Sequence, residues 1–137
     1  MKTSTTKSTD INRSWHLVDL STDSLGRAAT KIAELLIGKH KPNQSDNLDG
    51  GDYVVAINSD KLKVTGNKLL NKKYYRHSGY PGGLKEETLA QKMAKDSRKV
   101  IELAVKGMLP KNKHQNDRLV RLKVFKDDQH PYQAQLK

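Results

Sequence analysis

The apolar positions in the first half of the chain predict a strand, a helix and a second strand. Residues Trp15 to Leu20 are typical of a strand, and Tyr53 to Ile57 form an unbroken apolar run, as in a strand buried on both faces. Between these strands, apolar residues recur at helical spacing at Leu25, Ala28, Ala29, Ile32, Leu35 and Leu36. Asp23 or Ser24 can cap this helix, and Gly38 ends it. Strand, helix and strand over about forty residues indicate a βαβ unit with parallel strands and a right-handed crossover.

The second half of the chain predicts shorter elements. Extended segments are expected at residues 62–64, 72–77 and 122–125. A short helix is expected over residues 89–94, and a second helix begins near Asp96 or Ser97. The apolar side chains that this second helix buries are Val100, Ile101, Ala104, Val105 and Met108. The chain shows no internal repeat, so we expect a disordered N-terminal tail over residues 1–12 and a single domain over residues 13–137.

Charge is unevenly distributed along this pattern. The chain of 137 residues has a net charge of +11. Residues 61–85 contain seven basic and no acidic side chains, and residues 106–126 contain seven basic side chains and one acidic one. Such segregation favours an anionic partner over a merely solvated surface, and nucleic acid is the leading candidate. The absence of cysteine is typical of an intracellular protein, and no apolar run is long enough for a membrane helix, so a membrane partner is not expected.

Candidate catalytic and cofactor chemistry is sparse. The glycines of residues 79–83 fit neither the P-loop nor the dinucleotide spacing, because Leu84 and Pro81 occupy required glycine positions. The five histidines show no pairing at metal-binding spacing, and Asp49 and Asp52 beside two glycines are interpreted as turn formers. We therefore expect no enzyme activity, no cofactor, no metal and no small-molecule substrate.

The segment from Lys72 to Lys85 combines the features of an RNA-binding element. Its basic residues can neutralise phosphates, its tyrosines can stack on unpaired bases, and its glycines allow close backbone approach. We expect one of the adjacent residues Tyr74 and Tyr75 to be buried and the other to lie at the surface. No helix-turn-helix, zinc finger or basic zipper is present, so RNA is favoured over double-stranded DNA.

Several short segments occur in the order found in one known family. They are Trp15-His-Leu-Val-Asp19, Leu25-Gly-Arg27, Gly38-Lys-His-Lys41, Gly51-Asp-Tyr53, Val64-Thr-Gly-Asn-Lys68, Tyr74-Tyr-Arg-His-Ser-Gly79, Pro81-Gly-Gly83, Val105-Lys-Gly-Met-Leu-Pro-Lys111, Leu122-Lys-Val-Phe125 and His130-Pro131. On these motifs the chain resembles the large-ribosomal-subunit protein thirteen family, bacterial type, over about residues 13–135. The family pattern is not matched at residues 113–118 and 41–49.

The resemblance implies a three-layer α/β/α sandwich around a small, mostly parallel four-stranded sheet. It implies a structural constituent of the large ribosomal subunit that binds 23S-type ribosomal RNA, acts early in subunit assembly and lies beside other large-subunit ribosomal proteins. The implied location is the ribosome of the cytoplasm, with an organellar ribosome left open. Some relatives control translation, so messenger RNA is a further implied partner. Two alternatives stay open: a free-standing RNA-binding translational regulator and a small nucleotide-binding enzyme.

Charge segregation and the resemblance together predict a set of RNA-binding residues. The set is Arg27, Lys39, Lys41, Lys68, Lys72, Lys73, Arg76, His77, Gly79, Gly82, Gly83, Lys85, Lys106, Lys111, Lys113, Arg118 and Arg121.

Overall fold

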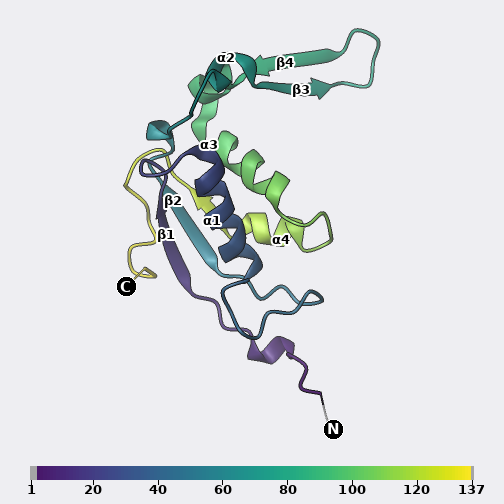
Figure 1. The fold of residues 1–137 in the computed structure, drawn as a ribbon, viewed down its shortest axis with the longest axis vertical. Coiled ribbons are helices and arrows are strands. Elements are labelled where there is room, and N and C mark those ends of the chain that lie inside the picture. The colour runs from purple at the N-terminus through teal and green to yellow at the C-terminus, as the bar shows by residue number, and fades with distance from the viewer. Residues whose placement is uncertain (1–2, 137) are drawn as a thin grey trace.

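The computed structural model describes residues 3–136, and a parallel sheet of three strands forms its centre. The strands are β1 (Trp15–Asp19), β2 (Tyr53–Ile57) and β5 (Leu122–Val124), in the order β1-β2-β5. All pairings are parallel. The helix α1 (Leu25–Ile37) connects β1 to β2 and lies against the sheet, so the predicted βαβ unit is confirmed (Figure 1).

Helix α1 forms where its caps and its apolar stripe predict. Ser24 has the extended backbone of an N-cap residue, and Gly38 ends the helix at φ +86°, a conformation that favours glycine. The Gly38 N–H donates to the Glu34 carbonyl at 3.0 Å. The buried face consists of Leu25, Ala28, Ala29, Ile32, Ala33, Leu36 and Ile37. This face forms the core together with Val54 and Ala56 of β2 and with the next long helix.

That long helix is α3 (Leu89–Met108), and it contains the predicted break. Asp96 has non-helical angles, φ −159° and ψ 101°, and its carboxylate accepts a hydrogen bond from the Arg98 N–H at 3.2 Å. Asp96 therefore caps the second part of the helix. Thr88 and Gln91 form a capping box at the start of the first part. The prediction of two consecutive helices is confirmed, although they are continuous across the kink.

The two faces of the sheet are covered differently. Helices α1 and α3 contact each other and pack on the face that carries Val54 and Ala56. On the opposite face, Trp15 stacks on Tyr53 with ring centroids 4.4 Å apart and on Tyr132 of the C-terminal segment at 5.0 Å. The α/β class with a small, mostly parallel sheet is confirmed. The structure refines the expected layers, since the parallel sheet has three strands and a non-helical segment contributes the cover over Trp15.

Two further strands form a separate antiparallel hairpin. Strands β3 (Lys73–His77) and β4 (Leu84–Thr88) pair with each other and not with the central sheet. The hairpin extends away from the body, above α3 (Figure 1). Its base is tied to the body by the short helix α2 (Lys68–Asn71) and by the Leu89 N–H, which donates to the Lys72 carbonyl at 2.9 Å. The last helix, α4 (Gln115–Val120), leads into β5.

The described part of the predicted tail, residues 3–12, has some local structure. Ser8–Asp10 form one turn of 3-10 helix, and the Thr6 hydroxyl donates to the Asn43 carbonyl at 3.0 Å. Residues 1–2 lie outside the described residues, and the domain boundary at residue 13 stays a prediction. Within residues 3–136, no helix combines the length and apolarity needed to cross a bilayer.

Candidate nucleic-acid interface

The projecting hairpin carries a pair of like charges directly opposite each other. Arg76 of β3 pairs in register with Lys85 of β4, and both side chains are exposed. Like charges at such cross-strand positions destabilise a hairpin unless an anion lies between them. On the other face of the hairpin, Lys73 pairs with Glu86 at 3.7 Å. The unbalanced positive charge therefore lies on the face that carries Arg76.

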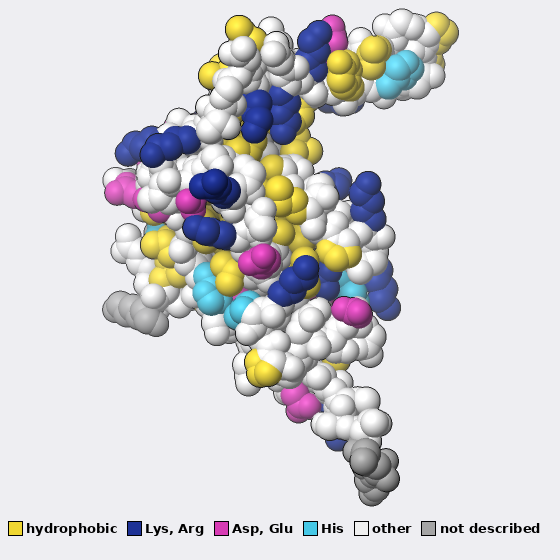
Figure 2. Space-filling view, in the orientation of Figure 1, with side chains coloured by type: hydrophobic (Ala, Val, Ile, Leu, Met, Phe, Trp, Pro, Cys, Tyr) yellow, Lys and Arg dark blue, Asp and Glu magenta, His cyan; other side chains and the backbone are white. Residues whose placement is uncertain are grey.

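This face forms one wall of a groove, and α3 forms the other. The basic side chains that line the groove are Arg76, Lys85, Lys92, Lys95 and Lys99, and its acidic ones are Glu87 and Asp96. Glu87 accepts ion pairs from Lys92 and Lys95, and Asp96 pairs with Arg98. Lys and Arg side chains stand at the base of the hairpin and along the edge of the body below it (Figure 2). The groove can accommodate an extended anionic chain.

Sequence reasoning missed the contribution of α3 to this groove. Residues 86–105 carry equal numbers of basic and acidic side chains, so their net charge does not predict an anion-binding surface. The signal was the spacing of Lys92, Lys95 and Lys99, which places all three on one helical face. Net charge over a segment hides such a face, because two of the four acidic residues of the segment, Glu86 and Glu102, do not line the groove.

The tip of the hairpin explains its glycines. Gly79 and Gly82 have φ +87° and +72°, and a Cβ on Gly83 would lie 2.1 Å from the Ser78 hydroxyl oxygen. The Gly79 N–H donates to His77 Nδ1 at 2.9 Å. The glycines are thus required by the turn, and their close approach to RNA stays a prediction. Tyr80 at the tip is 75% exposed.

The expectation for the two tyrosines is confirmed in part, because Tyr75 lies at the surface but Tyr74 is only partly buried. Tyr75 is 63% exposed, whereas Tyr74 packs against the core and lies beneath the ammonium groups of Lys72 and Lys92. Burial raises the pKa of the Tyr74 phenol. Tyr75 is therefore the tyrosine of this pair that a base can stack on.

Most of the other predicted contact residues are exposed, but they are spread over the surface. The exposed set outside the hairpin is Arg27, Lys39, Lys68, Lys72, Lys106, Lys111 and Lys113. Lys68 is the first residue of α2 and Lys72 directly follows this helix, at the base of the hairpin, and Lys106 lies near the end of α3. The structure does not gather all of them into one patch with the groove.

Two predicted residues, Arg118 and Arg121, require a correction. They are 3% and 6% exposed, and both pair with the carboxylate of Asp49. Arg121 Nη2 donates to Asp49 Oδ1 at 2.7 Å and to the Leu36 carbonyl at 2.9 Å. Burial by itself raises the pKa of Asp49, but the hydrogen bonds and charges of these arginines hold it below its usual value. Both guanidinium groups are buried and paired with Asp49, so they are not accessible to a phosphate, and we remove both residues from the proposed RNA contacts.

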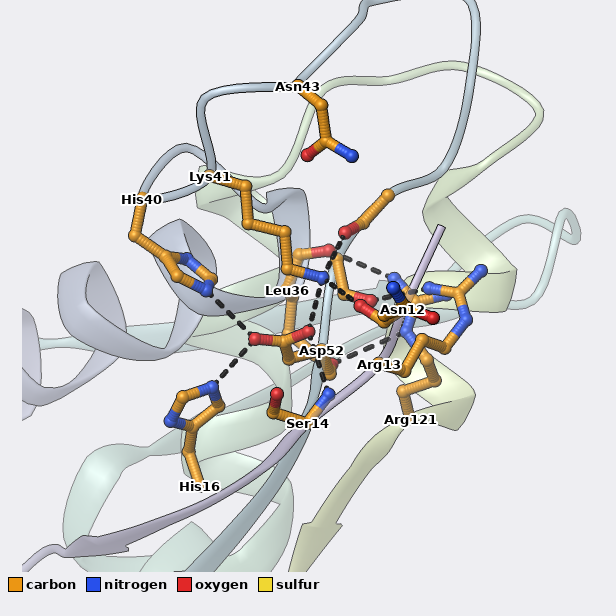
Figure 3. A network of polar contacts seen from close by, with 12 residues as sticks. Asn12, Arg13, Ser14, His16, Leu36, His40, Lys41, Asn43, Asp52 and Arg121 are labelled. Carbon is orange, nitrogen blue, oxygen red and sulfur yellow. Dashed lines mark hydrogen bonds and ion pairs between the residues drawn. The ribbon is translucent and has the colours of Figure 1, made fainter. Parts of the chain in front are cut away.

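Lys41 is also held inside a network, which is centred on Asp52 (Figure 3). The Asp52 carboxylate is 1% exposed, and its Oδ1 pairs with the Lys41 ammonium at 2.5 Å and accepts from the Ser14 N–H at 3.1 Å. Its Oδ2 lies 2.7 Å from His16 Nε2 and 2.8 Å from His40 Nε2. Burial raises the pKa of Asp52, but these partners outweigh it and lower the pKa to about 2.

This network corrects two readings of the sequence. Asp49 pairs with two buried arginines and Asp52 with the partly buried Lys41, so neither is a simple turn former, and two histidines far apart in sequence meet at one carboxylate. Gly51, between the two aspartates, is required by packing, because its Cβ would lie 1.7 Å from the Leu36 carbonyl oxygen. Local spacing gave no signal, since His16 and Asp52 are 36 residues apart.

Comparison with known proteins identifies the class to which this basic α/β chain belongs: it is a ribosomal protein. The family described as ribosomal protein L13 matches residues 13–131, and the chain belongs to that family. The resemblance inferred from the motifs is thereby confirmed, and so is the expectation that the chain is not an enzyme.

Individual relatives match over nearly the whole chain. The large ribosomal subunit protein uL13 of Thermotoga petrophila is 52% identical over 134 residues, which are 98% of this chain and 90% of the relative. The proteins of the same name from Syntrophotalea carbinolica and Kocuria rhizophila are 50% and 48% identical over 135 residues. These alignments cover 98% of this chain and 95% and 92% of the relatives.

Proposed function

We propose that the chain is a constituent of the large ribosomal subunit in the cytoplasm and that it binds the ribosomal RNA of that subunit. The observation that carries the proposal is the like-charged pair Arg76 and Lys85, which faces the lysines of α3 across the groove. An RNA backbone segment in this groove would relieve the repulsion, while Tyr75 and Tyr80 offer exposed rings to unpaired bases.

The groove is suited to recognising the shape and backbone of RNA rather than the identity of its bases. The groove offers flexible cations and no motif that reads base edges. Neutralising phosphates releases counterions, so the affinity should fall steeply as salt is added. A plot of the logarithm of the binding constant against the logarithm of the salt concentration should steepen by about 0.9 for each duplex phosphate contact. Neighbouring ribosomal proteins complete the proposed surroundings, as the names of the relatives suggest.

An early role in assembly is part of the same proposal. The domain has its own core of fully buried side chains from α1, β2 and α3, so it can fold before it meets RNA. A prefolded binder pays little ordering entropy on association. It can therefore associate with RNA that is not yet compact.

The test compares two double variants in binding to large-subunit ribosomal RNA transcribed in vitro. Arg76→Ala with Lys85→Ala removes the central charges of the groove. Lys7→Ala with Lys126→Ala removes the same charge from exposed positions outside it. Filter binding over a salt series should give a slope reduced by up to about two units for the groove variant. The control variant should keep the wild-type slope.

Equal slopes for the two double variants would reject the groove as the RNA site. Sedimentation of cell lysate addresses the alternative of a free-standing regulator of messenger RNA. A ribosomal constituent co-migrates with large subunits after a moderate salt wash, whereas a regulator stays near the top of the gradient.

A further inference from the structure

Two imidazoles and one carboxylate converge at the Asp52 network described above. His16 Nε2, His40 Nε2 and an oxygen of Asp52 all lie within 4.8 Å of one another. The imidazole planes are nearly perpendicular, at 85°, and both rings direct Nε2 toward the same oxygen (Figure 3). We propose that His16, His40 and Asp52 bind a divalent transition-metal ion of the Zn²⁺ type. This site is separate from the RNA-binding groove and does not rest on it.

The donor set fits this class of ion. Imidazole nitrogens suit zinc and its neighbours in the first transition row, and Zn²⁺ also accepts carboxylate oxygen. Three protein ligands leave at least one coordination position for water or an external ligand. The side chains of His16 and His40 are 32% and 38% exposed, so an ion can enter from solvent. Asp52, at 1%, forms the floor of the site.

The backbone places the three ligands accurately. His16 lies in β1, His40 follows the end of α1, and Asp52 directly precedes β2. The Asp52 N–H donates to the Leu35 carbonyl at 3.0 Å, which fixes the carboxylate relative to α1. Parallel pairing of β1 with β2 sets His16 beside Val54, two residues beyond Asp52. One ligand thus lies in a strand, and the other two lie within three residues of a helix end or directly before a strand, which limits their movement.

The oxygen of Asp52 that does not face the imidazoles, Oδ1, has the partners expected beside a metal-binding oxygen. Asp52 Oδ1 binds Lys41 and the Ser14 N–H, which leaves Oδ2 directed at the two imidazoles. Such outer contacts orient ligating groups. The Lys41 ammonium also repels a second cation, which weakens the affinity, but a carboxylate can hold a cation on each oxygen. Without an ion, Nε2 of each imidazole is the donor to Oδ2, because an ionised carboxylate only accepts hydrogen bonds. With an ion bound, the Nε2 proton moves to Nδ1 and Nε2 donates its lone pair.

The experiment uses the full chain and Zn²⁺ alone as the probe. His16→Gln and His40→Gln keep an amide N–H near the position of Nε2, which preserves a donor to Asp52 but removes the nitrogen ligand. His114→Gln is the matched control, because His114 lies outside the cluster. Isothermal titration calorimetry should show one Zn²⁺ per wild-type chain. Each cluster variant should weaken binding by about tenfold or more, since even outer-shell changes have effects of this size, and the control should match the wild type.

Two further measurements separate ligation from general adhesion to the basic surface. Nitrogen-15 NMR of the histidine rings should show Zn²⁺-induced shifts at Nε2 of His16 and His40 and none at His114. Zn²⁺ should also raise the Tm of the wild type more than that of His40→Gln, because an ion that binds the native state stabilises it. No saturable binding to the wild type, or equal affinity in all three variants, would overturn the proposal and leave the cluster as a hydrogen-bonded support for the fold.

Discussion

Replacing Arg121 by Met separates a structural role of this residue from an RNA-binding one. The Arg121 side chain is almost fully buried and donates to both oxygens of Asp49 and to the Leu36 carbonyl. Met fills a similar volume but leaves Asp49 with Arg118 as its remaining side-chain ion-pair partner. Removing one member of a buried ion pair destabilises a protein by about 3–5 kcal/mol. Because Asp49 keeps Arg118, we expect the lower end of this range, about 3 kcal/mol.

This magnitude is measurable by urea unfolding. With a urea dependence of about 2 kcal/mol/M, a loss of about 3 kcal/mol lowers the midpoint by about 1.5 M. The control is Lys31→Met, because Lys31 pairs with Asp23 at 2.5 Å but is 60% exposed. An exposed pair contributes about 0–1 kcal/mol. Under conditions in which both variants are folded, each should bind ribosomal RNA with the wild-type salt slope.

Two results would refute this reasoning. If Arg121→Met lowered the midpoint no more than Lys31→Met, the buried pair with Asp49 would not stabilise the fold as the geometry predicts. If the variant were folded but had a reduced salt slope for RNA, Arg121 would contact phosphate, as the sequence alone suggested. A double variant with Asp49→Asn should lose less stability than the two single losses added together, because both substitutions remove the same interaction between Arg121 and Asp49.

Three other predictions follow from single features of the structure. Gly51→Ala should lower the free energy of unfolding in urea by more than about 2 kcal/mol, because the new Cβ would overlap the Leu36 carbonyl. The control Gly26→Ala places its Cβ in open space and should not lower this free energy. Tyr75→Ala should weaken RNA binding by about 1–3 kcal/mol without changing Tm, and Tyr74→Ala should lower Tm. The pKa of Asp49 is lower in the folded than in the unfolded chain, so its contribution to stability is present above its unfolded pKa near 4 and is lost as pH falls below it. Urea midpoints measured from neutral to acidic pH should show this loss in the wild type and a smaller one in Asp49→Asn.

The features that the sequence predicted well depend on neighbours along the chain. The stripe and caps of α1, the break before Ser97 and the extended segment at residues 72–77 are all encoded within about one to three turns or a few residues. The number of strands in the central sheet was harder, because residues 62–64 form a single bridge from Lys63 to Ser24 rather than a strand. Whether an extended segment joins a sheet depends on partners that are distant in sequence.

The candidate site was predicted less completely, for the same reason. Arg118 and Arg121 belong to a basic run in the sequence, and the fold places Asp49 against them from about seventy residues away. Conversely, Lys92, Lys95 and Lys99 were not predicted to contact RNA, because their segment is neutral overall, although these lysines line the groove. Counting charge along the chain measures neither burial nor helical face, and both decide which cations can reach a phosphate.

The internal ion pairs also determine where the net charge acts. Asp49 and Asp52 offset two of the three positive charges of Arg118, Arg121 and Lys41, so only one of the eleven net positive charges belongs to these clusters and the others lie elsewhere on the molecule. Surface charges of one sign repel one another and destabilise the free protein, and salt screens this repulsion. We therefore expect salt to act in opposite directions on the free chain and on the proposed RNA complex, stabilising the first and dissociating the second. By this reasoning the free protein is least stable at low salt, and the RNA binding proposed above would relieve the repulsion between Arg76 and Lys85.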